Sequence, residues 1–353
     1  MYATMGFGRV KNLLMQGAAA LAVLATSNPA FAQDAKTGVR GVDDIIVTAR
    51  RKEEKNQDVP VSITAFSNER IAQMNIVDTQ SLQATVPSLV VGANGQGSRN
   101  TQSPTIRGQG ATFQASPGVA VYMAEAPLPG ALTLSLQGGP GNYLDLQNVQ
   151  VLKGPQGTLF GRNTTGGAVL LSPQKPTDKM EGYVQLQGGN YNDREVQVVV
   201  NVPVIEDKLL VRFAGEMVDR DGYTKDLNWN KDRDDKHYWT GRLGVTWRPT
   251  DKIENYLMAY NTWSRDNGPG MVGKGFNLGA YGVPVPYGYN QCDSGYPTGP
   301  CSAYQALVDE QNARGPRTVS LSVDEFSKIE TWGATDIFDY QLTDNLTIRN
   351  IAS

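Results

Sequence analysis

The second half of the chain alternates hydrophobic and polar residues with a period of two. Valine occupies every second position from 196 to 202, and Trp, Gly, Leu, Val and Trp occupy alternate positions from 239 to 247. Successive side chains of a β-strand point to opposite faces, so this pattern predicts strands with one apolar and one polar face. Further strands of this kind are predicted over 181–189, 209–216, 253–263, 329–342 and 346–351.

Short and long links alternate between these strands. The short links are 202–208, 248–252 and 342–345, and the longer ones are 189–194, about 220–237 and about 265–327. Outer-membrane barrels show this asymmetry, with short turns on the periplasmic side and longer loops outside. A soluble β-sandwich is the alternative, but its loops would be similar at both ends and would not include one of about sixty residues.

The sequence therefore predicts an all-β, transmembrane antiparallel β-barrel over residues 180–353. It supplies about seven strands, whereas plugged outer-membrane transporters close with about 22. An open sheet in lipid would leave an unpaired polar edge. We therefore expect the chain to be the N-terminal part of a protein roughly twice as long.

Residues 56–175 have a mixed pattern that predicts a compact α+β domain. Ser67 and Asp78 are placed to cap two short helices, and residues 92–103 are rich in Gly, Asn, Gln and Ser and predict a long exposed loop. The β-type runs of this domain are 59–66, 88–91, 118–123, 149–152 and 168–171.

The N-terminus has the three parts of a secretory signal. Arg9 and Lys11 are basic, residues 13–25 are apolar, and Ala30-Phe31-Ala32 fits the small-x-small cleavage rule. An N-terminal membrane anchor is the alternative, but the apolar core is too short for it. Residues 1–32 are thus predicted to be a signal peptide, and residues 33–55 a flexible segment before the α+β domain. Beyond the N-terminus no apolar run reaches 18 residues, so no membrane-spanning helix is predicted.

Composition narrows the function classes. The formal net charge is −3, and no basic stripe with interleaved aromatic residues suggests nucleic-acid binding. With one histidine, His237, no nucleophile–base pair is credible, so we expect no enzyme, no cofactor and no metal site. Cys292 and Cys301 are predicted to form a disulfide because the chain is exported; a metal site is the alternative, but His237 lies far away in sequence.

A glycine-rich segment lies between two apolar runs. Its glycines are at 154, 157, 161, 166 and 167. Glycine adopts positive φ and allows close backbone approach, so the segment predicts a tightly folded set of turns. A phosphate-binding loop would need Gly-Lys-Ser/Thr, but Gly161 is followed by Arg162 and Asn163.

This segment, with Leu144 to Val149 before it and Thr105 to Gly110, resembles the plug domain of TonB-dependent outer-membrane receptors. The residues that carry the resemblance are Arg107, Gly108, Gly154, Pro155, Gly157, Phe160, Gly161, Arg162, Gly166 and Gly167. Residues 122–127 (Tyr-Met-Ala-Glu-Ala-Pro) depart from the family, which more often has Asp-Gly in this turn. The resemblance implies that plug arginines, here Arg107 and Arg162, pair with acids on the barrel wall.

A short β-prone peptide precedes this domain. From its residues alone it is equally a first strand of the next domain or a tethered strand that adds to a partner's sheet edge. The resemblance implies a TonB box, bound on the periplasmic side by the energy-coupling protein TonB. The box residues are Asp44, Ile45, Ile46, Val47, Thr48 and Ala49.

The resemblance further implies active transport of a scarce small molecule, most often a ferric siderophore, across the bacterial outer membrane. Import of a carbohydrate, vitamin or aromatic compound, and a surface receptor without transport, are the alternatives. Outer-membrane lipid would surround the barrel. Phe113, Gln114 and Tyr143, in or beside the loops at the plug apices, are the expected ligand contacts.

Overall fold

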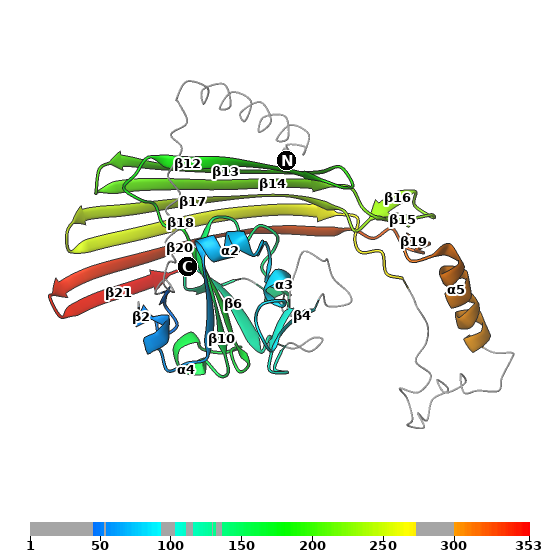
Figure 1. Ribbon diagram of the computed structural model, residues 1–353, viewed down its shortest axis with the longest axis horizontal. Coiled ribbons are helices and arrows are strands. Elements are labelled where there is room, and N and C mark those ends of the chain that lie inside the picture. The colour runs from blue at the N-terminus through cyan, green and yellow to red at the C-terminus, as the bar shows by residue number, and fades with distance from the viewer. Residues whose placement is uncertain are drawn as a thin grey trace, which may run out of the picture. The chain divides into compact units, whose positions relative to one another are not determined.

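The computed structural model of the chain describes residues 45–52, 54–92, 103–110, 116–128, 130–131, 136–272 and 300–353 (Figure 1). Two main sheets organise these residues. One is a small mixed sheet in the first half of the chain, and the other is a long antiparallel sheet in the second half.

The mixed sheet is the centre of the α+β domain. Its strand order is β3-β10-β11-β6-β7, with β10 antiparallel to both β3 and β11 and with β11 parallel to β6. The strands are β3 Ile63–Ser67, β6 Val119–Met123, β7 Ala126–Pro127, β10 Leu146–Lys153 and β11 Gly167–Pro173. Strands β10 and β11 are almost wholly buried, which explains the apolar run Ala168–Leu171 in β11 and the apolar residues Val149, Val151 and Leu152 in β10.

Short helices and two-stranded pairs surround this sheet. The predicted caps are confirmed: Ser67 accepts from the Arg70 amide at the start of α2, and Asp78 forms a capping box with Ser81 at the start of α3. The helices are η2 Asn56–Asp58, α2 Asn68–Gln73, α3 Thr79–Leu82 and α4 Gly157–Phe160. The pairs are β1 Ile46–Val47 with β2 Glu54–Lys55, β4 Leu89–Gly92 with β5 Ser103–Ile106, and β8 Gly130–Ala131 with β9 Leu136–Gln137.

The long sheet, called the wall below, confirms the predicted barrel strands. Its seven strands run from green (β12) to red (β21) in Figure 1, and each pairs antiparallel with the next strand in the wall. They are β12 Glu181–Gly189, β13 Asp193–Ile205, β14 Leu209–Arg220, β17 Lys236–Thr250, β18 Ile253–Asp266, β20 Ser327–Thr343 and β21 Leu346–Ala352.

The two faces of the wall differ as the period of two predicts. In β17 the side chains of Thr240, Arg242 and Thr246 are buried, whereas Leu243 and Trp247 are exposed. This arrangement, with polar residues buried and apolar residues exposed, is the reverse of that in a soluble sheet. It is the pattern of a barrel in lipid.

The links between wall strands correct the sequence predictions in two places. The link between β12 and β13, expected to be long, is a three-residue turn over 190–192 with Tyr191 and Asn192 at positive φ. The two long links are not plain loops, because they contain β15 Thr224–Asp226, β16 Lys231–Arg233, β19 Thr318–Val319 and the helix α5 Pro300–Arg314. Among the described residues no helix is long and apolar enough to cross a membrane.

Two hydrophobic clusters pack on opposite faces of the mixed sheet. The first includes Val149, Val151 and Val169 and continues into the wall at Tyr256 and Met258. The second has Leu152, Ala168, Leu170, Ala120 and Tyr122 from the sheet, with Val47, Ala49, Val59 and Phe160 packed on them. One face of the sheet therefore packs against the wall, and the N-terminal segment helps to cover the other.

Candidate functional site

The peptide expected to be a TonB box is packed onto the mixed sheet. Ile46 and Val47 form β1, which pairs with β2 in the register Ile46↔Lys55 and Val47↔Glu54. The side chains of Val47 and Ala49 are 0% and 1% exposed, while Ile46 remains 45% exposed. A flexible segment through residue 55 was expected; the structure corrects this for residues 45–52, because Val47 and Ala49 fill the second cluster. Asp44 lies outside the described residues.

A buried glutamine on the interior strand β10 holds this peptide. The Thr48 amide donates to Gln150 Oε1 at 3.0 Å, and Gln150 Nε2 donates to Thr48 Oγ1 at 3.3 Å and to Asn148 Oδ1 at 2.9 Å. Gln150 is fully buried in β10. Sequence reasoning missed this residue, although a glutamine inside an apolar strand is a signal, because a buried amide needs partners.

Arg51 follows the peptide and binds the turn between β6 and β7. Its Nη1 donates to the Glu125 carbonyl at 2.9 Å and to Glu125 Oε2 at 3.2 Å. The guanidinium carbon lies 4.5 Å from the centre of the Phe160 ring and 5.8 Å from that of Tyr122, within the range of cation–π attraction. Phe160 belongs to the glycine-rich segment, so the segment supplies one side of the Arg51 site.

The glycine-rich segment folds into tight turns, as predicted. The Gly154 amide donates to the Gly166 carbonyl at 2.9 Å, closing the segment between β10 and β11. Gly154, Gly161 and Gly167 have φ of +100°, +78° and +151°. A Cβ at Gly167 would lie 2.2 Å from the Leu152 carbonyl oxygen, so a side chain there has no space.

The expected pairing of Arg107 and Arg162 with wall acids is not seen within the seven wall strands that the structure describes. Both are exposed, and none of the ion pairs between described residues joins either of them to an acid of the wall. The charges are arranged the other way round: Asp145 and Glu125 of the mixed-sheet domain pair with arginines of the wall.

The Asp145 pair is the strongest polar contact between this domain and the wall. Arg212 on β14 donates from Nε and Nη2 to the two carboxylate oxygens of Asp145, at 2.8 and 2.7 Å, and both side chains are buried. Arg242 on β17 donates from Nη2 to the Asp145 carbonyl at 2.8 Å. A bidentate pair of this kind fixes orientation as well as distance.

Tyr143 is not a surface contact for a ligand. Its side chain is buried in the first cluster, and its hydroxyl donates to Thr79 Oγ1 at 3.0 Å. Burial raises the pKa of the Tyr143 phenol well above its ordinary value. Phe113, Gln114 and Cys292 lie outside the described residues, so their predicted roles are unchanged, and Cys301 lies in the first turn of α5.

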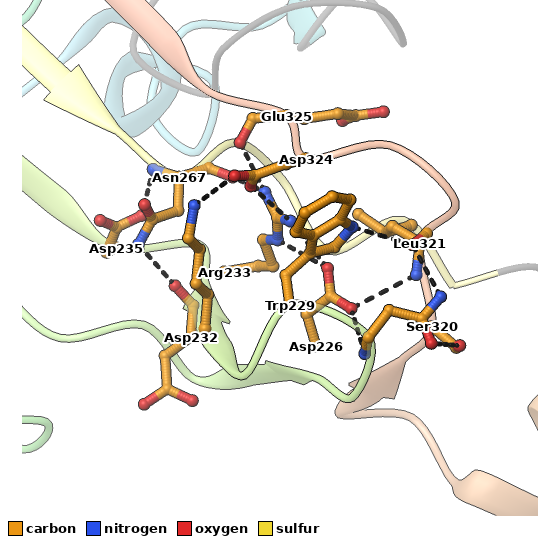
Figure 2. Close-up of polar contacts among 12 residues, drawn as sticks. Asp226, Trp229, Asp232, Arg233, Asp235, Asn267, Ser320, Leu321, Asp324 and Glu325 are labelled. Atoms are coloured by element: carbon orange, nitrogen blue, oxygen red, sulfur yellow. Dashed lines mark hydrogen bonds and ion pairs between the residues drawn. The ribbon is translucent and has the colours of Figure 1, made fainter.

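Arg233 joins three segments of the long links (Figure 2). Its Nε and Nη2 donate to Asp226 Oδ2 at 3.0 and 2.7 Å, and its Nη1 donates to the Glu325 carbonyl at 2.6 Å and to the Asn267 carbonyl. The side chains of Arg233 and Asp226 are fully buried. In the described ranges no group of His, Cys, Asp and Glu has the arrangement of a metal site.

Comparison with known families gives one match. Residues 55–168 match the family model described as the TonB-dependent Receptor Plug Domain. The match covers strands β3, β6, β7 and β10, the Glu125 turn and the five glycines of the glycine-rich segment, and it ends at the start of β11.

Two curated relatives are receptors. The Pesticin receptor of Yersinia pestis is 27% identical over 161 residues, which are 44% of this chain and 22% of that protein. The Ferrioxamine B receptor of Salmonella typhimurium is 31% identical over 115 residues, which are 33% of this chain and 16% of that protein. The chain thus spans only a minor part of these relatives.

Solved structures share the fold. The ferric yersiniabactin uptake receptor FyuA from Yersinia pestis superposes with a TM-score of 0.63 at 19% identity, covering 82% of this chain and 40% of that one. The ferric-catecholate import receptor Fiu from E. coli, in its open form, gives 0.60 at 19% identity, covering 84% and 39%. Both matches include the mixed sheet and the wall together, since neither sheet alone makes up so large a share of the chain.

Proposed function

The chain belongs to the TonB-dependent receptors of the bacterial outer membrane, and on this premise we propose that it acts in energised import of a ferric siderophore. The mixed-sheet domain is the plug, and the wall is part of the barrel around it. The observation that carries the proposal is the plug itself: a folded domain tied by a buried Asp145–Arg212 pair to a sheet with an apolar outer face.

The siderophore class is supported by the relatives. The Salmonella relative is named a receptor for ferrioxamine B, an iron chelate, and it is 31% identical over the matched part. The ferric chelate is the cargo in this proposal and not a resident cofactor. Import of another scarce solute is the alternative, with the same plug and the same box.

In this proposal the plug blocks the barrel until TonB pulls on the box. TonB binds Ile45–Ala49 on the periplasmic side by strand addition, in which main-chain hydrogen bonds give affinity. For this the peptide has to leave β2, and Val47 has to leave the second cluster. The Thr48–Gln150 bonds connect the peptide to the interior strand β10, so a pull on the box acts directly on the plug sheet.

Strand addition by the box is tested with Ile46→Pro. Proline has no amide hydrogen and cannot donate to a partner strand, so uptake of ⁵⁵Fe-loaded ferrioxamine B should fall at least about tenfold. Ile46→Ala keeps the amide and, because Ile46 is half exposed, serves as the matched control with near-normal uptake. Binding of the chelate to the cell surface should be the same in both variants.

Two results would contradict the proposal. Undiminished uptake by the Ile46→Pro variant would show that the box does not act by strand addition. Absence of both binding and uptake of the chelate in cells with the unaltered protein, with another solute imported instead, would establish the alternative cargo.

A further inference from the structure

The docked box closes the second face of the plug sheet. Val47 and Ala49 lie in one buried cluster with Leu152, Tyr122 and Phe160. While β1 is paired with β2 and its side chains are buried in this cluster, the peptide cannot pair with a strand of another protein. Whatever holds the box on the plug therefore controls when TonB can bind it.

Arg51 is the charged contact of the docked segment. Its carboxylate partner is Glu125, and its guanidinium also contacts the carbonyl oxygens of Glu125 and Leu159 and the rings of Phe160 and Tyr122. Arg51 has φ of 60°, in the left-handed region that non-glycine residues rarely adopt. The backbone is thus held in an uncommon conformation at the residue that binds Glu125.

Glu125 is shared between the box segment and the wall. Its Oε2 accepts from Arg51, while its Oε1 lies 3.2 Å from Nη2 of Arg349 on β21. Arg349 has a second acid, because its Nε lies 3.3 Å from Asp339 Oδ1 on β20. One plug carboxylate therefore connects the box segment to two strands of the wall.

The turn that carries Glu125 is strained for its sequence. Ala124 and Glu125 have φ of 47° and 68°, the combination of a type I′ turn, which Asn-Gly or Asp-Gly normally fills. Strain of this kind persists where the side chain has a use, and here the side chain that replaces glycine is the one that binds both arginines.

We propose that Glu125 acts as a latch with two partners. Its ion pair with Arg51 holds the TonB box on the plug, and its ion pair with Arg349 makes the strength of the Arg51 pair depend on the position of the wall. That release of the box allows TonB to bind it rests on the proposed function. When Glu125 moves toward Arg349, Arg51 loses its carboxylate and the box segment is released. Arg349→Gln should have the opposite effect, because both oxygens of Glu125 then become available to Arg51.

The latch is tested by the reactivity of a buried reporter thiol. Ala49→Cys, in a Cys292→Ser and Cys301→Ser background, places a thiol where the docked segment shields it. The rate of its reaction with a maleimide-polyethylene glycol in isolated outer membranes measures undocking. Glu125→Gly and Arg51→Gln should each raise this rate about tenfold, the factor that corresponds to losing one modest charged contact.

Two features of the design separate the latch from general damage. Glu125→Gly restores the residue that a type I′ turn favours, so it removes the carboxylate without harming the fold. Arg50→Gln makes the same charge change one residue away, at an exposed arginine that contacts Glu54, and should leave the rate within about twofold. Arg349→Gln should lower the rate at least about twofold.

The outcomes are distinct. Unchanged reactivity in the Glu125→Gly and Arg51→Gln variants would overturn the latch, and an unchanged or raised rate in the Arg349→Gln variant would overturn its coupling to the wall. The labelling needs neither TonB nor a siderophore. Failure of the latch therefore appears as unchanged labelling with uptake still sensitive to Ile46→Pro, whereas failure of the proposed function appears as unaffected uptake.

Discussion

At the scale of single residues, Asp145 concentrates the contact between plug and wall. Its carboxylate accepts two hydrogen bonds from Arg212, and its carbonyl accepts from Arg242 and from the Gln174 amide. Its φ of 47° turns the chain sharply just before β10 begins. A buried ion pair adds little net stability over apolar residues, but removal of one partner leaves the other charge buried and unpaired.

We therefore expect Asp145→Asn to destabilise the protein strongly. Asparagine tolerates the left-handed conformation, so the backbone is kept, while the charge is removed and one of the two oxygens that accept from Arg212 becomes an NH2 donor. The free energy of unfolding should fall by about 3 kcal/mol. Among the described residues, the buried Arg212 would then have only Glu181, at 3.5 Å, as an acidic partner. Guanidinium unfolding in detergent micelles, followed by tryptophan fluorescence, measures it.

The matched control is Asp178→Asn. Asp178 pairs with Arg248 at 3.4 Å and is half exposed, so its loss should cost less than about 1 kcal/mol. Equal effects of the two variants would mean that the Asp145 pair has no special role in seating the plug.

At the scale of elements, the glycines of the glycine-rich segment have different structural roles. Gly167 begins β11 at φ +151° against the Leu152 carbonyl, whereas Gly157 begins α4 with open space around the position of a Cβ. The first glycine is required by the close approach of two strands. The structure shows no comparable requirement at the second.

Alanine substitution should separate these two positions. Gly167→Ala forces β10 and β11 apart and should cost more than about 2 kcal/mol, since strain adds to displaced packing. Gly157→Ala should be neutral or stabilise by up to about 1 kcal/mol, because alanine favours the helix and restricts the unfolded chain. The same unfolding experiment measures both, and a harmless Gly167→Ala would contradict the close approach.

At the scale of the whole molecule, the strands of the wall could be predicted from the sequence, but the contacts between the wall and the plug could not. The alternation within 239–247 is local, so each strand carries its own inside and outside, and the strands were predicted correctly. The Asp145–Arg212 pair joins residues 67 positions apart, and no periodicity says which wall arginine faces which plug acid. The pairing of Arg107 and Arg162 with wall acids stays a prediction, because the described wall has seven strands.

Elements without a clear period were missed. Strands β15 and β16 have three residues each, too few to show alternation, and the sequence of α5 has no apolar stripe at helical spacing. Strands β15 and β16 are held by long-range contacts, in which Arg233 is central. The buried arginine bonds to residues on both sides of the second long link, so it acts as a tie between the two loop regions (Figure 2).

Removal of this tie should loosen the loops and spare the plug and wall. Arg233→Met keeps an apolar stem but leaves Asp226 buried without its cation, so the segment 318–325 should detach from β15. Trypsin should then cut after the exposed Arg317 about tenfold faster in isolated outer membranes, as expected for a local opening equilibrium.

The matched control is Lys231→Met, which removes a neighbouring cation whose pair with Asp324 is partly exposed. The rate of cleavage after Arg317 in this variant should stay within about threefold of that in the unaltered protein. Equal cleavage of the two variants would show that the loops are held by their backbone pairing and not by Arg233.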